Sequence, residues 1–135
     1  MAVNSTTARA DIFKEFLSVI KTHLTTSGVK VTNALVKDTS QFPQIVINAP
    51  QMPRSRLTFG TTAYDRSGDI EIEVYAKKMK DVVELVDDVE NTIFTHLSSL
   101  SVQNISLGDS TPATIDVGGT SVHVIVIPVA FKFVR

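Results

Sequence analysis

Hydrophobic and polar positions alternate along residues 69 to 77 and then change to a helical spacing, and this change defines the central unit of the chain. The alternating stretch places Ile70, Ile72, Val74 and Ala76 on one face and Asp69, Glu71, Glu73 and Tyr75 on the other. Such alternation predicts a strand with one buried face. After Lys80 the apolar positions lie three and four residues apart, at Val82, Leu85, Val86, Val89, Ile93 and Leu97. This spacing predicts a helix whose apolar stripe packs on the strand, while Asp81, Glu84 and Asp88 form a solvated acidic face.

A first helix is predicted from about residue 7 to residue 25. Its apolar positions also follow the helical period, at Ile12, Phe13, Phe16, Leu17, Ile20 and Leu24. The helix should stop before Gly28, a residue that suits a left-handed C-terminal cap.

Shorter elements are predicted between the two helices. Residues 29 to 37, with a possible bulge near Asn33, residues 45 to 47 and residues 57 to 64 have strand character. Pro50 and Pro53 bracket Gln51 and Met52, and Arg54 and Arg56 follow, which predicts a projecting loop over residues 48 to 56, here called the arginine loop. The turn chemistry of residues 65 to 68 predicts a hairpin between the strand at 57 to 64 and the central strand.

The end of the chain predicts further strands. Residues 102 to 107 suggest a loop or short strand, residues 108 to 112 a turn, and residues 114 to 117 and 120 to 126 a hairpin around Gly118 and Gly119. Residues 122 to 134 are apolar at nearly every position, so this strand must be covered on both faces or must meet another chain. Pro128 cannot donate to a ladder and predicts a bulge, a bend or an edge there.

The order of helix, strands, helix and strands predicts a single α+β domain over residues 1 to 135, with a mainly antiparallel sheet and two main helices packed on one face. The chain has a formal net charge of -1 and no cysteine, so it has no general attraction to nucleic acid or anionic membrane and no disulfide or thiolate chemistry. The N-terminus lacks a secretory signal pattern, and no apolar run reaches the roughly 18 residues that span a bilayer. A cytoplasmic location is therefore expected.

Candidate catalytic chemistry is weak throughout. His23, His96 and His123 have no metal-ligand spacing and are expected at the surface or at the ends of elements. The carboxylates of Glu71 and Glu73, and those of Glu84, Asp87 and Asp88, fall at solvent-facing positions rather than in an evident pocket. No nucleophile elbow or phosphate-binding glycine motif occurs. We expect no enzymatic activity, no catalytic residue, no cofactor and no metal site.

Basic residues form two local groups: Arg54, Arg56 and Arg66, and Lys77, Lys78 and Lys80. Aromatic residues that would stack on bases are not interleaved with them, which argues against sequence-specific nucleic-acid binding. The groups are solvated loops or, since arginine is enriched at interfaces, contacts across a protein assembly.

Four segments together resemble the tail terminator, or tail completion, proteins of long-tailed bacteriophages, a family that includes the lambda-like minor tail proteins and neck-protein relatives. The segments are ARADIFKEFLSVIKTHL, FPQIVINAP, IEIEVYAKKMKDVVELVDDVENTIF and HVIVIPVAFKFV. The resemblance implies a structural virion subunit, assembled in the host cytoplasm as a homo-oligomeric ring of about six copies. Such a ring caps the tube of major tail protein, ends its polymerisation and offers a surface to the head-tail connector proteins. DNA would pass through the lumen without sequence-specific binding, and no membrane is involved.

The resemblance and the residue pattern together place candidate interface positions on two segments. They are Met52, Arg54, Arg56, Phe59 and Arg66 around the arginine loop, and Ile127, Phe131 and Phe133 on the last strand. Two alternatives stay open. A head-to-tail connector or stopper protein belongs to the same assembly class but has a different neighbour, whereas a small α+β ligand-binding domain would show a pocket in which Glu71, Glu73 or His123 converge around a small molecule.

Overall fold

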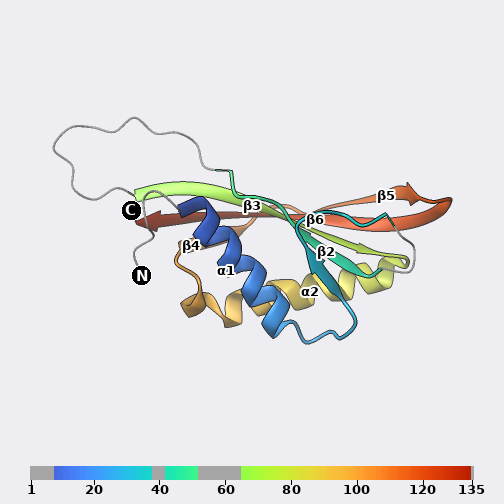
Figure 1. Cartoon of the computed structure of the whole chain (residues 1–135), viewed down its shortest axis with the longest axis horizontal. Coiled ribbons are helices and arrows are strands. Elements are labelled where there is room, and N and C mark those ends of the chain that lie inside the picture. Colours follow the sequence, from blue (N-terminus) through green and yellow to red (C-terminus); the bar gives the residue numbers. More distant parts are fainter. Residues whose placement is uncertain (1–7, 38–41, 52–64, 135) are drawn as a thin grey trace.

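The computed structural model describes residues 8 to 37, 42 to 51 and 65 to 134 (Figure 1). It is an α+β fold in which two α-helices and one short 3-10 helix accompany a six-stranded sheet. The strand order is β1-β2-β3-β6-β4, with β5 also paired to β6, and β1 and β2 form the parallel pair in this otherwise antiparallel sheet. The predicted fold class is therefore confirmed. The elements are α1 (Ala8–His23), β1 (Lys30–Thr32), β2 (Gln44–Ile47), β3 (Asp65–Ala76), α2 (Met79–Thr95), η2 (Leu97–Ser99), β4 (Gln103–Leu107), β5 (Thr111–Val117) and β6 (Thr120–Val134).

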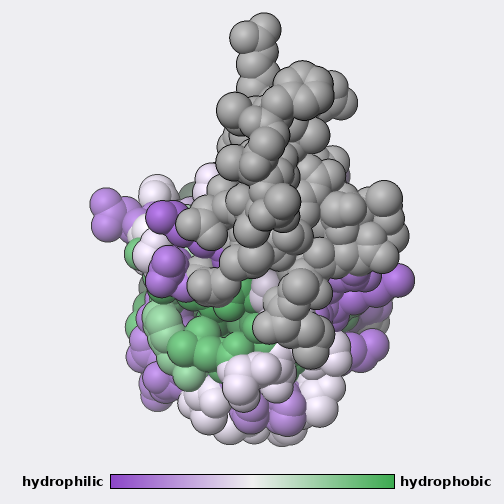
Figure 2. All heavy atoms as spheres, turned by 90° about the vertical axis from the view of Figure 1, so that its left-hand side faces the viewer, coloured by the Kyte–Doolittle hydropathy of each residue, from purple (hydrophilic) through white to green (hydrophobic). Residues whose placement is uncertain are grey.

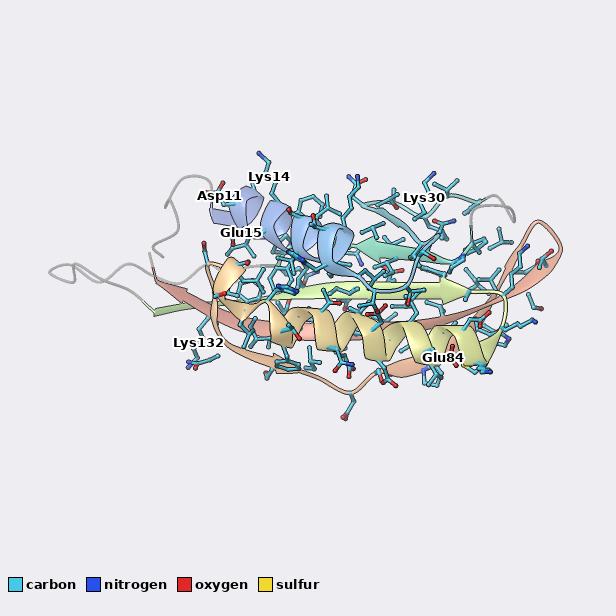
Figure 3. All side chains as sticks on the ribbon, turned by 90° about the horizontal axis from the view of Figure 1, so that it is seen from below. Asp11, Lys14, Glu15, Lys30, Glu84 and Lys132 are labelled. Atoms are coloured by element: carbon cyan, nitrogen blue, oxygen red, sulfur yellow. The ribbon has the colours of Figure 1, made fainter. Side chains whose placement is uncertain are left out.

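Both helices cover the same face of the sheet, as Figure 3 shows from the helix side. The apolar stripes of α1 and α2 and the even-numbered residues 70 to 76 of β3 belong to one buried cluster, which includes Phe16, Leu85, Ile70 and Ile72. The central strand and helix thus pack as their periodicity predicts, because each buries the one face that is apolar.

Strand β3 is longer than predicted, and the predicted turn at residues 65 to 68 is wrong. Residues 65 to 76 pair with residues 123 to 134 of β6 without a register shift. Gly68 lies inside β3, where an added Cβ would come within 3.0 Å of both the Gln51 carbonyl oxygen and the Phe131 ring. Glycine is needed here for close approach rather than for a turn. The predicted strand at 57 to 64 lies outside the described residues.

Strand β6 is apolar on both faces because this subunit covers both of them. Ile125, Ile127, Val129 and Phe131 face the helices and join the main core. On the opposite face, Val122 and Val124 pack with Val46, Tyr75 and Val117 in a second buried cluster, to which Phe42 also contributes. The double coverage predicted for this strand is present within one chain from Val122 to Val126, whereas Ala130 further along the same face is exposed.

Pro128 and Pro112 are accommodated because neither nitrogen faces a ladder acceptor. In an antiparallel strand the N–H and C=O of one residue point to the same side. The Pro128 carbonyl accepts a hydrogen bond from the Gly108 N–H at 2.8 Å, so its missing donor faces the break between β4 and β5, while pairing with β3 continues unbroken. Thr111 and Pro112 begin β5 instead of ending a turn, which corrects the prediction for residues 108 to 112.

The hairpin at Gly118 and Gly119 is confirmed. Both residues have positive φ, of 58° and 84°, as a primed two-residue turn requires. The flanking residues Val117 and Thr120 form the closing pair. Counting along β5 from this pair, the nitrogen of Pro112 points to the outer edge of the sheet, where a proline blunts unwanted strand pairing.

Two predictions for the first half of the chain need adjustment. The strand expected over residues 29 to 37 is only Lys30–Thr32, and the fully buried Gln44 side chain bonds the backbone of Val36 instead of a continued ladder. Gly28 has a φ of 76°, but α1 ends at His23, so this glycine shapes the turn into β1 and does not cap the helix directly.

Candidate functional site

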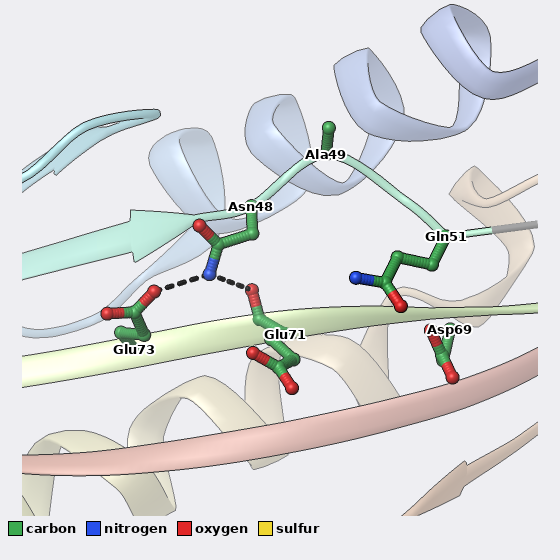
Figure 4. Close-up of a pocket in the computed structure, with 6 residues that line it drawn as sticks. All are labelled: Asn48, Ala49, Gln51, Asp69, Glu71 and Glu73. Atoms are coloured by element: carbon green, nitrogen blue, oxygen red, sulfur yellow. Dashed lines mark hydrogen bonds between the residues drawn. The ribbon is translucent and has the colours of Figure 1, made fainter.

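A polar groove lies on the face of the sheet opposite the helices (Figure 4). It has a volume of about 250 Å³ and is lined by Asn48, Ala49, Gln51, Asp69, Glu71 and Glu73. The acids come from β3, whose odd-numbered residues point away from the core. The segment after β2 forms the other wall, held by backbone bonds between Gln51 and Asp69 and from Asn48 to Glu71.

One carboxylate of the groove is anchored and two are open. The Asn48 amide donates a hydrogen bond to the Glu73 carboxylate and another to the Glu71 carbonyl oxygen at 3.3 Å. The Tyr75 hydroxyl also donates to Glu73. Burial raises the pKa of Tyr75 above its usual range, and the hydrogen bond to Glu73 and the negative charge of Glu73 raise it further. Asp69 and Glu71 are exposed, so they are the carboxylates that a partner can reach.

The groove gathers negative charge but not the parts of a catalytic site. Its carboxylates lie on alternate residues of one strand, about 7 Å apart along the backbone, and project from the same face of the strand. No group of three or more His, Asp or Glu side chains in the described part of the chain is arranged to hold a metal ion. His123 does not line the groove and instead lies 3.4 Å from the Thr114 hydroxyl through Nδ1.

His23 and His96 meet at the helix ends, a pairing that sequence spacing did not reveal. Their rings stack with centroids 3.8 Å apart and an interplanar angle of 16°. Each histidine lies at the C-terminal end of its helix, as predicted. Because the helices are distant in sequence, only their packing brings the rings together.

Asp88 joins α2 to the segment that follows α1. Its carboxylate accepts hydrogen bonds from the backbone N–H of Thr25 at 3.3 Å and of Thr26 at 2.8 Å, and from their hydroxyls at 2.8 and 2.5 Å. Burial acts to raise the pKa of Asp88, but the bonds from Thr26 and Thr25 outweigh it and hold the pKa below its ordinary value. Asp88 is therefore not part of a purely solvated face, which corrects the prediction.

Glu15 of α1, labelled in Figure 3, binds the segment between η2 and β4. Its carboxylate accepts bonds from the Ser101 N–H at 2.7 Å and hydroxyl at 2.6 Å. Together with the histidine stack and Asp88, these bonds make the α1–α2 contact polar at its rim and apolar beneath.

Two of the predicted interface residues of β6 are buried in the core. Ile127 is 0% and Phe131 2% exposed, and both face the helices, so their proposed role as interface residues is corrected. The Phe131 ring contacts that of Phe16, with centroids 6.0 Å apart. Arg66 and Phe133 are register partners on β3 and β6. The other predicted positions, Met52, Arg54, Arg56 and Phe59, lie outside the described residues.

Exposed hydrophobic side chains lie along α2 and η2. They are Met79, Val83, Phe94 and Leu97, between 37% and 49% exposed. Figure 2 shows hydrophobic side chains gathered on the end of the molecule where α2 ends and α1 begins. At the other end of α2, Met79 and Val83 accompany three exposed lysines: Lys77, Lys78 and Lys80.

The sequence matches no family model and no curated protein. None of the described helices is both long enough and apolar enough to span a bilayer.

Proposed function

We propose that this chain is a structural subunit of a long-tailed phage virion, which forms a ring of about six copies on the end of the tail tube. The ring ends tube polymerisation and offers the surface to which head-tail connector proteins attach. The chain acts by binding and not by catalysis.

The observation that carries the proposal is the place of the four segments on which the family resemblance rests. Residues 8 to 24 contain α1, residues 42 to 50 contain β2, residues 70 to 94 contain most of β3 and of α2, and residues 123 to 134 lie in β6. These elements are the ones that build the main core. The segments that carry the resemblance are therefore core elements of the subunit and not surface loops.

The packing of β6 supports a subunit that folds before it assembles. Its large apolar residues from Val122 to Phe131 are mostly buried within the chain, so contacts between copies use the remaining surface, including charged positions. A closed ring needs two different patches on each subunit, because each interface joins one patch to the other on the next copy.

The test is capping of purified tail tubes. Tubes are incubated with the chain, challenged with more major tail protein, and measured for length and end structure by electron microscopy. We expect capped tubes that no longer elongate. Tubes that elongate equally with and without the chain would contradict the proposal.

The arginine loop supplies a test of which residues contact the tube. Reversal of its charges by Arg54→Glu with Arg56→Glu is expected to weaken capping, since these residues are the proposed tube contact. Lys14→Glu with Lys21→Glu, at exposed positions of α1, changes the charge by the same amount and is the matched control. Normal capping by the loop variant would exclude the loop but not the function.

A connector or stopper role differs only in the neighbour that is bound. Binding to purified heads in preference to tail tubes would favour that role. The ligand-binding alternative has one observation in its favour, since Glu71 and Glu73 share a groove with Asp69. Titration with calcium chloride or spermidine, followed by backbone amide shifts at Asn48 and Gln51, tests it.

A further inference from the structure

Two surfaces of opposite charge lie on one subunit. The acidic row consists of Asp69, Glu71 and Glu73 on the open face of β3, and the lysine turn consists of Lys77, Lys78 and Lys80 between β3 and the first turn of α2. None of the three carboxylates forms a salt bridge with any residue that the structure describes.

The acidic row has a flat and partly apolar neighbour. Register pairs Asp69 with Ala130, Glu71 with Pro128 and Glu73 with Val126, so a strip of small uncharged side chains runs beside the carboxylates. Asp69, Glu71 and Ala130 are exposed, and both helices lie on the other face of the sheet. A docking partner would therefore meet negative charge and apolar surface side by side.

The lysine turn presents the complementary combination. Its three lysines are exposed, and Met79 and Val83 beside them are 37% and 46% exposed. Lys80 has only a 3.9 Å contact with Glu84, in which both side chains are largely exposed. Such a pair contributes little.

Helix stability does not explain the lysines. Cations near a helix N-terminus oppose the helix dipole, and Lys78, the N-cap of α2, makes no side-chain capping bond. A serine, threonine or aspartate at this position would stabilise the helix better. The lysines therefore destabilise α2, which is consistent with a role in contacts outside the subunit.

No salt bridge joins the two surfaces within the described part of the chain. Glu73 and Lys77 are about 13 Å apart along an extended backbone. A second copy of the chain carries the complement of each surface. We propose that the lysine turn of one copy docks on the acidic row of the next, a head-to-tail contact of the kind that a ring repeats. This inference rests on the proposed function and names the surfaces that its ring would use.

Charge reversal with mixing tests the contact. One variant carries Asp69→Lys with Glu71→Lys, and the other carries Lys77→Glu with Lys78→Glu. Glu73 is left intact because it holds Asn48 and Tyr75. All four altered side chains are exposed, and far-UV circular dichroism checks the fold of each variant. Asp116→Lys, on the exposed part of β5, is the matched control.

Self-association is measured by analytical ultracentrifugation over a wide range of protein concentration and at two salt concentrations. Each reversed variant alone should associate at least about tenfold more weakly than the native chain, because like charges face one another. An equimolar mixture of the two should recover association, since every contact in an alternating ring again joins opposite charges. Association that survives both reversals, or a mixture that gains nothing over its parts, would overturn the proposed contact.

A second measurement covers a chain that is monomeric in dilute solution. The native chain has no cysteine, so Glu71→Cys and Lys78→Cys variants each carry a single thiol. Oxidation of their mixture on tail tubes should yield the mixed dimer well above either homodimer. If tubes are capped but no mixed dimer forms, the interface is wrong and the proposed function stands. If tubes are not capped at all, the proposed function fails, and a mixed dimer formed in solution would then support the contact alone.

Discussion

Removal of the Asp88 carboxylate should loosen α2 from the end of α1. Asp88→Ala deletes the acceptor of four hydrogen bonds, two from backbone N–H groups and two from threonine hydroxyls. Bonds to a charged group contribute about 1.5 to 3 kcal/mol each when they are well protected. Thr25 and Thr26 are exposed, so water replaces much of the loss. We expect the free energy of unfolding at pH 7 to fall by about 1 to 2 kcal/mol in total.

Asp87→Ala is the matched control, because it changes the same side chain to the same residue on the next position of α2. Asp87 is exposed, and together with burial its charge raises the pKa of Glu90. Its removal relieves a repulsion and should leave stability within about 0.5 kcal/mol of the native value. The difference between the two variants isolates the bonds of Asp88 from charge and helix propensity.

The direction of the pKa shift of Asp88 determines how its contribution to the free energy of unfolding changes with pH. The pKa of Asp88 is lower in the folded chain than its ordinary value of 3.8, so folding favours the ionised form. The stabilisation is complete above the unfolded pKa and is lost as the pH falls through the lower, folded pKa. Urea unfolding followed by circular dichroism should therefore show the two stability curves converging below about pH 4. Equal losses for both variants at pH 7, or a gap that widens in acid, would refute this reasoning.

Three further changes test the core and the edges. Phe16→Ala should destabilise the chain by about 3 to 5 kcal/mol in urea unfolding, against less than about 1 kcal/mol for the half-exposed Phe94→Ala, and equal losses would contradict the assigned core. Gln44→Leu leaves the backbone groups of its partner unpaired and should cost about 1 to 3 kcal/mol, whereas Gln51→Leu at an exposed position should not, as thermal melts would show. Gly108→Ala would place a Cβ 2.8 Å from a proline Cγ and should lower the melting temperature, and an unchanged temperature would mean that the β4–β5 break yields easily.

Periodicity was informative wherever one face of an element is buried. The alternation from Asp69 to Ala76 and the three-and-four spacing from Val82 to Ile93 predict β3 and α2 correctly, because a strand and a helix each repeat their core-facing side chain at a characteristic interval. The two-glycine turn is equally local, since positive φ at both positions is a property of the residues themselves.

Local chemistry misled where a glycine or proline serves a distant neighbour. Gly68 looks like a turn residue, but its role depends on the Phe131 ring across the sheet. Pro128 suggests a break in β6, yet its nitrogen, which carries no hydrogen to donate, faces Gly108 in the break between β4 and β5. Neither neighbour can be identified from the surrounding sequence.

The candidate site was predicted in part. The open acidic face of β3 follows from alternation, but the groove forms because the segment through Asn48 and Gln51 returns along it. The contacts between the helices, including the bonds of Asp88 and the histidine stack, need the relative placement of α1 and α2.

By itself the sequence determined which residues form the helices and most of the strands, because backbone conformation and one-sided burial leave a periodic record in neighbouring positions. Only the tertiary structure decided that Ile127 and Phe131 belong to the core of the subunit and not to an interface. A strand that is buried on both faces has the same apolar sequence pattern whether the covering residues belong to its own chain or to another. Here the helices supply the cover on one face, and the second cluster supplies it on the other face from Val122 to Val126, through contacts between residues far apart in the chain.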